Sequence, residues 1–248
     1  RLESVFTHVT RVRIPLPLLV HIDSNFFLDT LTLGEVILSQ TESSHIIKAF
    51  RAHKGDSLTL CDGKGRFADA ELAEIAHDVC KVYIKSISEQ EPQPQVHLAI
   101  GCLSDGGEEE ITFHAAQMPL AAIHLLRTER SQEPRDSELN RLRRRMESKS
   151  LVALKQSRKS WLTEIKAPVF LNEFLENFKG NLIVCDQIGN SSLSAINYPL
   201  SIIIGPEGGF SHNELEVMKN KNATFLSLGP TRLRSISAPI FALGKIAQ

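Results

Sequence analysis

The sequence lacks a long hydrophobic run, an ordered set of cysteines and a strong excess of charge. Its longest apolar stretches fall well short of the roughly 18 residues that a membrane-spanning helix needs. Hydrophobic residues make up 42% of the 248 residues and charged residues 23%, which is typical of globular proteins. We therefore expect no membrane span and a soluble chain of one large or two smaller domains.

The cysteines Cys61, Cys80, Cys102 and Cys185 have no short spacing to one another or to histidine. Structural zinc sites draw on closely spaced pairs, so we expect no metal. Scattered cysteines are typical of free, mostly buried thiols in a reducing compartment. The opening segment RLESVFTHVTRVRIP also lacks the charged, apolar and then small order of a secretory signal. Together these features predict a cytoplasmic protein.

Net charge is close to zero, at −1, but basic residues gather in one segment. Residues 127–159 contain eleven basic and five acidic side chains, a charge of about +6. An apolar stripe at helical spacing is formed there by Leu139, Leu142 and Met146. The basic residues that the stripe leaves outside are Arg141, Arg144, Arg145 and Lys149. This face is either merely solvated or a surface for nucleic-acid phosphates.

The two halves of the chain differ in pattern and meet at the polar, proline-containing stretch EQEPQPQ, residues 89–95. Before it, strand-like runs cover 34–38, 57–61, 67–75 and 79–87. The intervening CDGKGR predicts a hairpin turn. Gly55 is expected to close a short helix in SSHIIKAFRAHKGD. Residues 1–90 are therefore predicted to form a small β-barrel.

After this stretch, strands alternate with helices. The predicted strands are 96–103, 121–126, 181–185, 201–204 and 223–228, and the predicted helices are 108–117, 136–157, 171–178, one after Ser211 and one at the end of the chain. Such alternation predicts an α/β domain over residues 91–248, with a parallel sheet covered by helices on both faces.

The stretch IIIGPEGGFSHNE joins a strand directly to a helix. Residues 202–204 are all isoleucine, which suits a strand buried on both faces. Ser211 and Glu214 form a capping box, and Phe210 and Leu215 can form its hydrophobic staple. The glycines between them therefore follow the carboxyl end of a strand, where open α/β sheets bind ligands.

The glycine-rich turn itself has two interpretations. Gly205, Gly208 and Gly209 allow a close approach to a ligand or a positive φ, and Glu207 could accept hydrogen bonds from a ribose or an ammonium group. The alternative is a tight connection whose glycines serve only packing. Neither Gly-Lys-Ser/Thr nor GxGxxG is present, which disfavours phosphate binding.

A second loop of the same kind favours a ligand site. The strand at 223–228 ends in Gly229, and Pro239 suits the first turn of the last helix. We predict that the two loops lie at adjacent sheet edges and line one pocket.

These segments carry a family resemblance. IIIGPEGGFSHNE, LSLG and RLRSISAP resemble the cofactor-binding signature of SPOUT methyltransferases, specifically the bacterial 16S ribosomal RNA uridine-N3 methyltransferases. SSHIIKAFRAHKGDSLTLCDGKG is similar to the PUA-like RNA-binding barrel of that family, and LLRTERSQ and LKQSRKSWLTEIKAP are similar to its internal segments. The resemblance covers nearly the whole chain.

The resemblance implies a trefoil knot, a homodimer with a shared active site, S-adenosylmethionine as cofactor and 16S ribosomal RNA of the small subunit as partner. The cofactor residues that it implies are Ile204, Gly205, Glu207, Gly208, Leu228, Gly229, Leu233 and Arg234. Together with the charge pattern, it predicts RNA-facing residues at Lys48, Arg51, Arg130, Arg141, Arg144, Arg145, Gln156 and Arg158. Without an RNP-type aromatic motif, recognition should depend on shape and backbone.

Arg234 is the candidate catalytic residue. Methylation of uridine N3 requires stabilisation of the deprotonated ring, and a guanidinium is always charged; the alternative role is a salt bridge that holds the knot. We identify no general base, because His114 and His212 fit surface or packing positions better.

Departures from the family pattern leave other functions open. Ile236 and Gln117 stand where the family has glutamate, and His114 stands where it has lysine. A non-catalytic RNA-binding or ribosome-assembly protein would explain the loss of both glutamates. An α/β enzyme for a small nucleotide would use the same loops, but it would leave the barrel and the basic helix unexplained.

Overall fold

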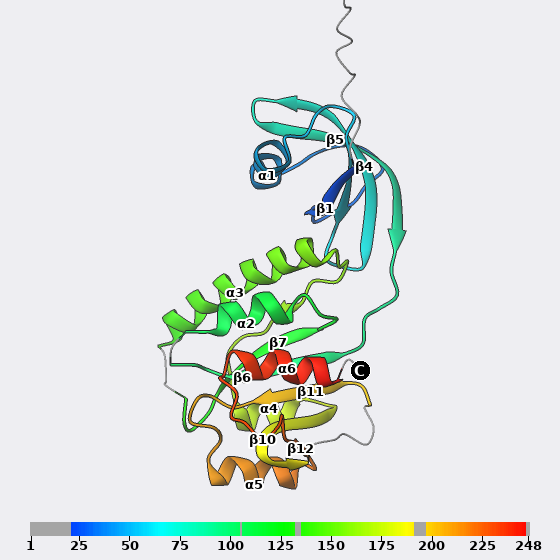
Figure 1. The fold of residues 1–248 in the computed structure, drawn as a ribbon. Helices are drawn as coiled ribbons and strands as arrows, with labels where there is room; N and C mark the ends of the chain where they lie inside the picture. Colours follow the sequence, from blue (N-terminus) through cyan, green and yellow to red (C-terminus); the bar gives the residue numbers. More distant parts are fainter. Residues whose placement is uncertain (1–20, 105, 132–134, 191–196, 247–248) are drawn as a thin grey trace, which may run out of the picture.

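The computed structural model describes residues 21–104, 106–131, 135–190 and 197–246. Residues 1–20, which the sequence assigns to the first domain, and Glu133 of the basic segment lie outside the described residues. The described chain forms a five-stranded N-terminal sheet and a seven-stranded C-terminal sheet, with a long helix between them (Figure 1). Within these ranges, no helix combines the length and apolar composition needed to cross a membrane.

The N-terminal sheet has the strand order β1-β3-β4-β5-β2. Its strands are β1 (His21–Phe27), β2 (Gly34–Ile37), β3 (Ser57–Cys61), β4 (Arg66–Ala76) and β5 (Val79–Glu89). The predicted hairpin is confirmed, because β3 and β4 pair antiparallel across the turn. Helix α1 (Gln40–Phe50) shares a core with the sheet that includes Phe26, Ile46 and Leu60. Strand β1 was not predicted, because apolar and polar residues do not alternate regularly in its sequence, HIDSNFF.

Helix α1 ends earlier than predicted. Arg51, and not Gly55, takes the left-handed conformation that terminates it, with φ of 51°. Gly55 also has a positive φ, but its N–H donates to Leu72 O in the turn before β3. A left-handed residue other than glycine gives little signal in a sequence, so glycine was the wrong choice for the helix end.

The C-terminal sheet has the order β12-β10-β11-β6-β7-β8, and β9 also pairs with β7. Its strands are β6 (Val96–Gly101), β7 (Ala122–Arg127), β8 (Glu164–Ile165), β9 (Val169–Phe170), β10 (Asn181–Asn190), β11 (Leu200–Ile204) and β12 (Thr224–Leu226). All of these strand pairs are parallel, as predicted. The two-residue strands β8 and β9 are too short to give a sequence pattern and were not predicted.

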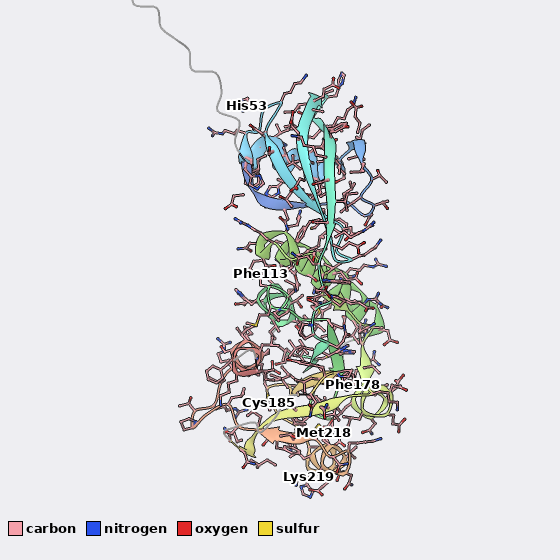
Figure 2. The ribbon with its side chains drawn as sticks, turned by 90° about the vertical axis from the view of Figure 1, so that its right-hand side faces the viewer. His53, Phe113, Phe178, Cys185, Met218 and Lys219 are labelled. Carbon is pink, nitrogen blue, oxygen red and sulfur yellow. The ribbon has the colours of Figure 1, made fainter. Side chains whose placement is uncertain are left out.

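Helices cover both faces of this sheet, which confirms the predicted layering. On one face lie α2 (Glu108–Ala115), α3 (Asp136–Ser157) and α6 (Ser237–Ile246), and on the other α4 (Leu171–Asn177) and α5 (His212–Asn220) (Figure 1). Ile202 and Ile204 face the first group, whereas Ile203 packs with Met218 of α5. Figure 2 shows Met218 between α5 and the sheet, and Lys219 pointing outward. The isoleucine run is thus buried on both sides.

The turn between β3 and β4 docks on the segment that follows α3. Gly65 N donates to Ser160 O at 2.9 Å, and Leu162 N donates to Gly63 O at 2.9 Å. The Trp161 ring covers Gly65 so closely that a Cβ there would lie 2.3 Å from Trp161 Cζ2. This contact joins the two sheets and requires glycine.

A buried ion pair strengthens the same junction. Lys155 Nζ of α3 lies 2.7 Å from Glu42 Oε1 of α1, and Phe27 N donates to the other carboxylate oxygen at 3.3 Å. Glu42 is only 4% exposed. Removal of one partner from a buried pair leaves an uncompensated charge, so Lys155 of the basic segment has a structural role.

We predict that Gly65→Ala separates the N-terminal sheet from the segment around Trp161. The added methyl group collides with the ring, at a cost of about 1–3 kcal/mol. Trp161 is the only tryptophan of the chain, so its fluorescence emission should shift to longer wavelength, and the melting temperature should fall.

Gly34→Ala is the matched control. Gly34 has φ of 99° against 97° for Gly65, but no atom lies within 4 Å of its Cβ position. Both variants therefore carry similar backbone strain, and only Gly65→Ala adds the collision. Equal losses of stability, with unchanged tryptophan emission, would contradict the docking role of the turn.

Candidate active site at the carboxyl ends of three parallel strands

A cavity of about 490 Å³ lies where β11 and β12 end, beside residues 185–187 of β10. Cys185 of β10 is in register with Ile204 of β11 and with Leu226 of β12. The three strands run in the same direction, so the loops that follow them meet at one edge of the sheet. The prediction that both glycine-bearing loops line one pocket is confirmed. The two strands that carry the loops are not direct neighbours, because β10 lies between β11 and β12.

All eight residues predicted for the cofactor line this cavity; they are Ile204, Gly205, Glu207, Gly208, Leu228, Gly229, Leu233 and Arg234. The further lining residues that sequence reasoning did not assign to the cofactor include Cys185, Asp186, Gln187 and Arg232. The signal for the first three was available, since they stand at the carboxyl end of the predicted strand 181–185. No sequence pattern indicated that the Arg232 side chain would point into the pocket.

Close backbone packing holds the loop after β11 in place. A Cβ at Gly101 would lie 2.6 Å from Pro206 Cδ, so the end of β6 must be glycine for the loop to pass. Gly209 has φ of 68°, and its N–H donates to Pro206 O at 2.8 Å. Both interactions fix the GPEGG turn at the edge of the pocket.

The predicted capping box at the start of α5 is confirmed. Ser211 Oγ accepts from Glu214 N at 3.1 Å, and Glu214 Oε2 accepts from Ser211 N at 2.8 Å. The second oxygen of Glu214 accepts from Glu129 N at 2.8 Å. A single buried carboxylate thus links the loop after β7 to the helix that follows the pocket.

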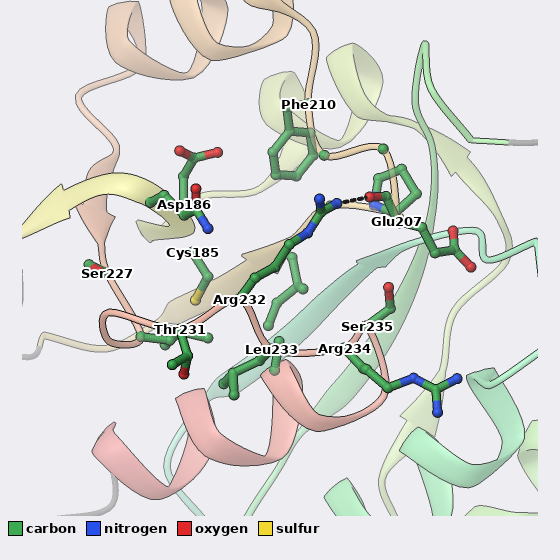
Figure 3. Close-up of a pocket in the computed structure, with 18 of the residues that line it drawn as sticks. Cys185, Asp186, Glu207, Phe210, Ser227, Thr231, Arg232, Leu233, Arg234 and Ser235 are labelled. Carbon is green, nitrogen blue, oxygen red and sulfur yellow. Dashed lines mark hydrogen bonds between the residues drawn. The ribbon is translucent and has the colours of Figure 1, made fainter.

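The Glu207 side chain is turned toward the loop after β6. Its Oε1 accepts hydrogen bonds from Ser104 N at 2.9 Å and from Ser104 Oγ at 3.0 Å. One carboxylate oxygen is therefore engaged by the protein itself, and Figure 3 shows the side chain extending away from Cys185.

The loop between β12 and α6 forms the opposite wall. Gly229 has φ of 136°, a conformation that favours glycine. Ile236 packs on Gly107, where a Cβ would lie 2.6 Å from Ile236 Cγ1. Arg234 O accepts from Ser237 N at 3.0 Å at the start of α6, and Pro239 lies in the first turn of that helix, as predicted.

Arg232 and Arg234 point in different directions from this loop. Arg232 crosses the pocket, and its Nη2 donates to Glu207 O at 2.5 Å (Figure 3). Both side chains are exposed, but Arg234 extends outward, away from Cys185. His114 and His212 are exposed, and neither is among the described lining residues.

Cys185 is the sulfur-bearing residue of the wall. Burial raises the pKa of its thiol to about 12, with a smaller lowering effect from Lys245 and a raising effect from Asp186. The thiol is therefore protonated at neutral pH and is a poor nucleophile. All four cysteines are free, and three are buried, as predicted. Nowhere in the described ranges do three or more His, Cys, Asp or Glu residues group as metal ligands.

The residues predicted to face RNA lie in three places. Arg130 lies beside the pocket, where its Nη1 donates to Gly208 O at 3.0 Å. Lys48 and Arg51 are exposed at the end of α1. The others are exposed along α3 or at its end; they are Arg141, Arg144, Arg145, Gln156 and Arg158.

Part of the basic segment serves the fold. Arg145 Nε lies 2.5 Å from Glu109 Oε1, and Arg158 pairs with Asp23. Lys159 Nζ donates to Ala116 O at 2.9 Å at the end of α2, and burial lowers the pKa of Lys159 to about 8. The apolar stripe of α3 packs on the core as predicted.

Comparison with protein families gives two matches. A model described as an RNA methyltransferase domain matches residues 89–247. A second model, described as an RNA methyltransferase PUA domain, matches residues 38–82.

Individual relatives agree with these matches. Ribosomal RNA small subunit methyltransferase E of Synechocystis is 30% identical over 223 residues, which cover 85% of this chain and 72% of that protein. A solved structure described as a methyltransferase of Legionella pneumophila, in complex with S-adenosylmethionine, is 26% identical with a TM-score of 0.80, over 89% of this chain and 95% of that one. The Neisseria gonorrhoeae ribosomal RNA small subunit methyltransferase E, bound to S-adenosylmethionine, shares the fold at 22% identity and a TM-score of 0.76, over the same shares of the two chains.

We predict that Glu214→Ala destabilises the wall of the pocket. The substitution leaves the N–H groups of Glu129 and Ser211 without their buried acceptor, at a cost of about 1–3 kcal/mol. The melting temperature should fall by several degrees in differential scanning calorimetry. Glu216→Ala on the same helix is the control, because Glu216 pairs only with Lys219 at the surface. Equal melting temperatures for both variants would show that the carboxylate does not hold the loops together.

Proposed function

The chain belongs to the RNA methyltransferase family and is an S-adenosylmethionine-dependent ribosomal RNA methyltransferase, and we propose that it methylates N3 of a uridine in 16S RNA. The observation that supports this proposal most strongly is the single pocket formed by the two glycine-bearing loops. Both loops lie within the segment that matches the RNA methyltransferase domain.

The residues of the pocket fit the cofactor. A cavity of about 490 Å³ lies within the range of roughly 300–1,000 Å³ that small ligands occupy. Ile204, Leu228 and Leu233 offer apolar surface for the adenine ring, and Gly205 and Gly229 allow close approach of the backbone. S-adenosylmethionine supplies a methyl group on a sulfonium, which makes it an electrophile.

The role of the protein is to align the nucleophile and to stabilise its charge. N3 of uridine carries a proton at neutral pH, and this proton must pass to solvent water before N3 can accept the methyl group; S-adenosylhomocysteine would be the other product. Arg234 extends from the pocket wall toward the outside, where an RNA base would approach (Figure 3). Its guanidinium would stabilise the negative charge on the deprotonated ring and its carbonyl oxygens.

The exposed face of α3 is proposed as the main RNA-binding surface. Within the described residues, neither Arg141 nor Arg144 forms an ion pair. Arg130 donates a hydrogen bond to Gly208 O and would extend the RNA-binding surface to the GPEGG turn. Lys48 and Arg51 would extend the surface onto the N-terminal sheet. Phosphate contacts of this kind position RNA without reading its sequence.

The proposal also includes the domain organisation, the knot, the oligomeric state, the substrate particle and the cellular location. The domain boundary near residue 90, the trefoil knot, the homodimer with a shared active site, action on the small ribosomal subunit and a cytoplasmic location all accord with the family. Ile236 packs against Gly107 and the core and also lines the cavity, so it contributes apolar surface where the family has glutamate.

Methylation can be tested with a labelled methyl donor and 30S particles that lack the modification. We expect label in 16S RNA and mapping of the product to N3 of one uridine. Arg234→Gln should lower the rate by about 100-fold or more, since one charge-stabilising donor is lost, while affinity for S-adenosylhomocysteine stays unchanged. Cofactor binding without label in RNA would instead favour the non-catalytic RNA-binding alternative.

The RNA surface can be tested with the double variant Arg141→Ala/Arg144→Ala. Loss of two phosphate contacts should weaken binding to 16S RNA and reduce the salt dependence of log K by about one per contact. Filter binding at several salt concentrations gives this slope. Lys219→Ala is the control, because Lys219 lies on α5, on the opposite face of the sheet from α3. An equal slope for both variants and the wild type would rule out α3 as the contact surface.

A further inference from the structure

Arg232 is the cation that enters the pocket. It belongs to the loop after β12, and its side chain reaches across the cavity to the loop after β11 (Figure 3). There Nη2 donates to the backbone oxygen of Glu207 at 2.5 Å. Within the described ranges, no carboxylate lies close enough to form an ion pair with Arg232.

The hydrogen bond to Glu207 O uses only one of the N–H donors of the Arg232 guanidinium. Arginine has five N–H donors in a planar fork, and a backbone carbonyl is a neutral, single acceptor. A carboxylate takes two parallel hydrogen bonds from the same fork, and such charge-assisted bonds are roughly twice as strong as neutral ones. An anionic ligand in the pocket would therefore displace the carbonyl contact.

The charges of the cofactor match those of the pocket. Its sulfonium and ammonium groups are positive, and the acidic residues Asp186 and Glu207 are among the residues that line the pocket, with Oε1 of Glu207 bonded to Ser104. Its carboxylate is the one anionic group, and Arg232 is the described lining cation that points inward. We propose that Arg232 binds the carboxylate of the methionine moiety of S-adenosylmethionine, which rests on the function proposed above.

An RNA phosphate is the other anion that Arg232 could bind. The geometry favours the cofactor, because the guanidinium spans the space between the two loops that enclose the cavity. Arg130 and Arg234 are the arginines proposed to contact RNA near the pocket, and Arg130 lies beside the GPEGG turn while Arg234 extends outward.

Two ligands that differ in the amino-acid end test this assignment by calorimetry. S-adenosylhomocysteine keeps the carboxylate, whereas methylthioadenosine has the same nucleoside and sulfur but no amino-acid end. For Arg232→Gln we expect affinity for S-adenosylhomocysteine to fall by about 10- to 100-fold, as for loss of a hydrogen bond to a charged group. Affinity for methylthioadenosine should not change.

Arg130→Gln is the matched control. Its guanidinium also bonds a backbone oxygen of the GPEGG turn, Gly208 O at 3.0 Å, but it is not among the described lining residues. We expect this variant to bind both ligands as the wild type does. The melting temperature of each variant without ligand shows that the fold is retained.

Three results would overturn the assignment. Equal weakening of both ligands by Arg232→Gln would mean that Arg232 only holds the two loops together. Unchanged affinity for S-adenosylhomocysteine with weaker RNA binding would assign Arg232 to a phosphate. Failure of the wild type to bind either ligand would refute the proposed function as well, and this result is distinct from the first two, in which the wild type binds.

Discussion

The pocket depends on the parallel register of β10 with its two neighbours. Cys185 is aligned with Ile204 on one side and with Leu226 on the other, so β11 and β12 end at the same level beside it, while β10 continues to Asn190. The chain that leaves each strand must then pass the same point, and Gly205 and Gly229 allow it to do so without side chains that would fill the space. An antiparallel β12 would carry Gly229 to the opposite end of the sheet, and no shared cavity would exist.

The basic segment shows how one stretch of sequence can serve both structure and recognition. Lys155 is held by Glu42 at the junction of the two sheets, and Lys159 is held by carbonyl groups at the end of α2. Arg141 and Arg144 on the same stretch remain exposed. The number of basic residues in this segment therefore overestimates the number available to bind RNA. Lys155 and Lys159 bind acceptors within the protein, and Lys155 joins the N-terminal sheet to α3.

Much of the fold and of the site could be predicted from short-range patterns in the sequence. The isoleucines at 202–204 and the capping box at Ser211 are short-range patterns, and both predictions are confirmed. The order of strands is not a local property, and β10 was therefore not placed between β11 and β12. The left-handed Arg51 and the inward path of Arg232 depend on neighbours far along the chain, which no pattern of residues reveals.

A crystal structure with S-adenosylhomocysteine tests the central claim most directly. We expect density for the nucleoside between the loops at 204–208 and 228–234, with Cys185 and Asp186 in the wall beside it. Density at any other place, or a filled cavity between Gly205 and Gly229, would contradict the assignment of this pocket as the methyl-donor site.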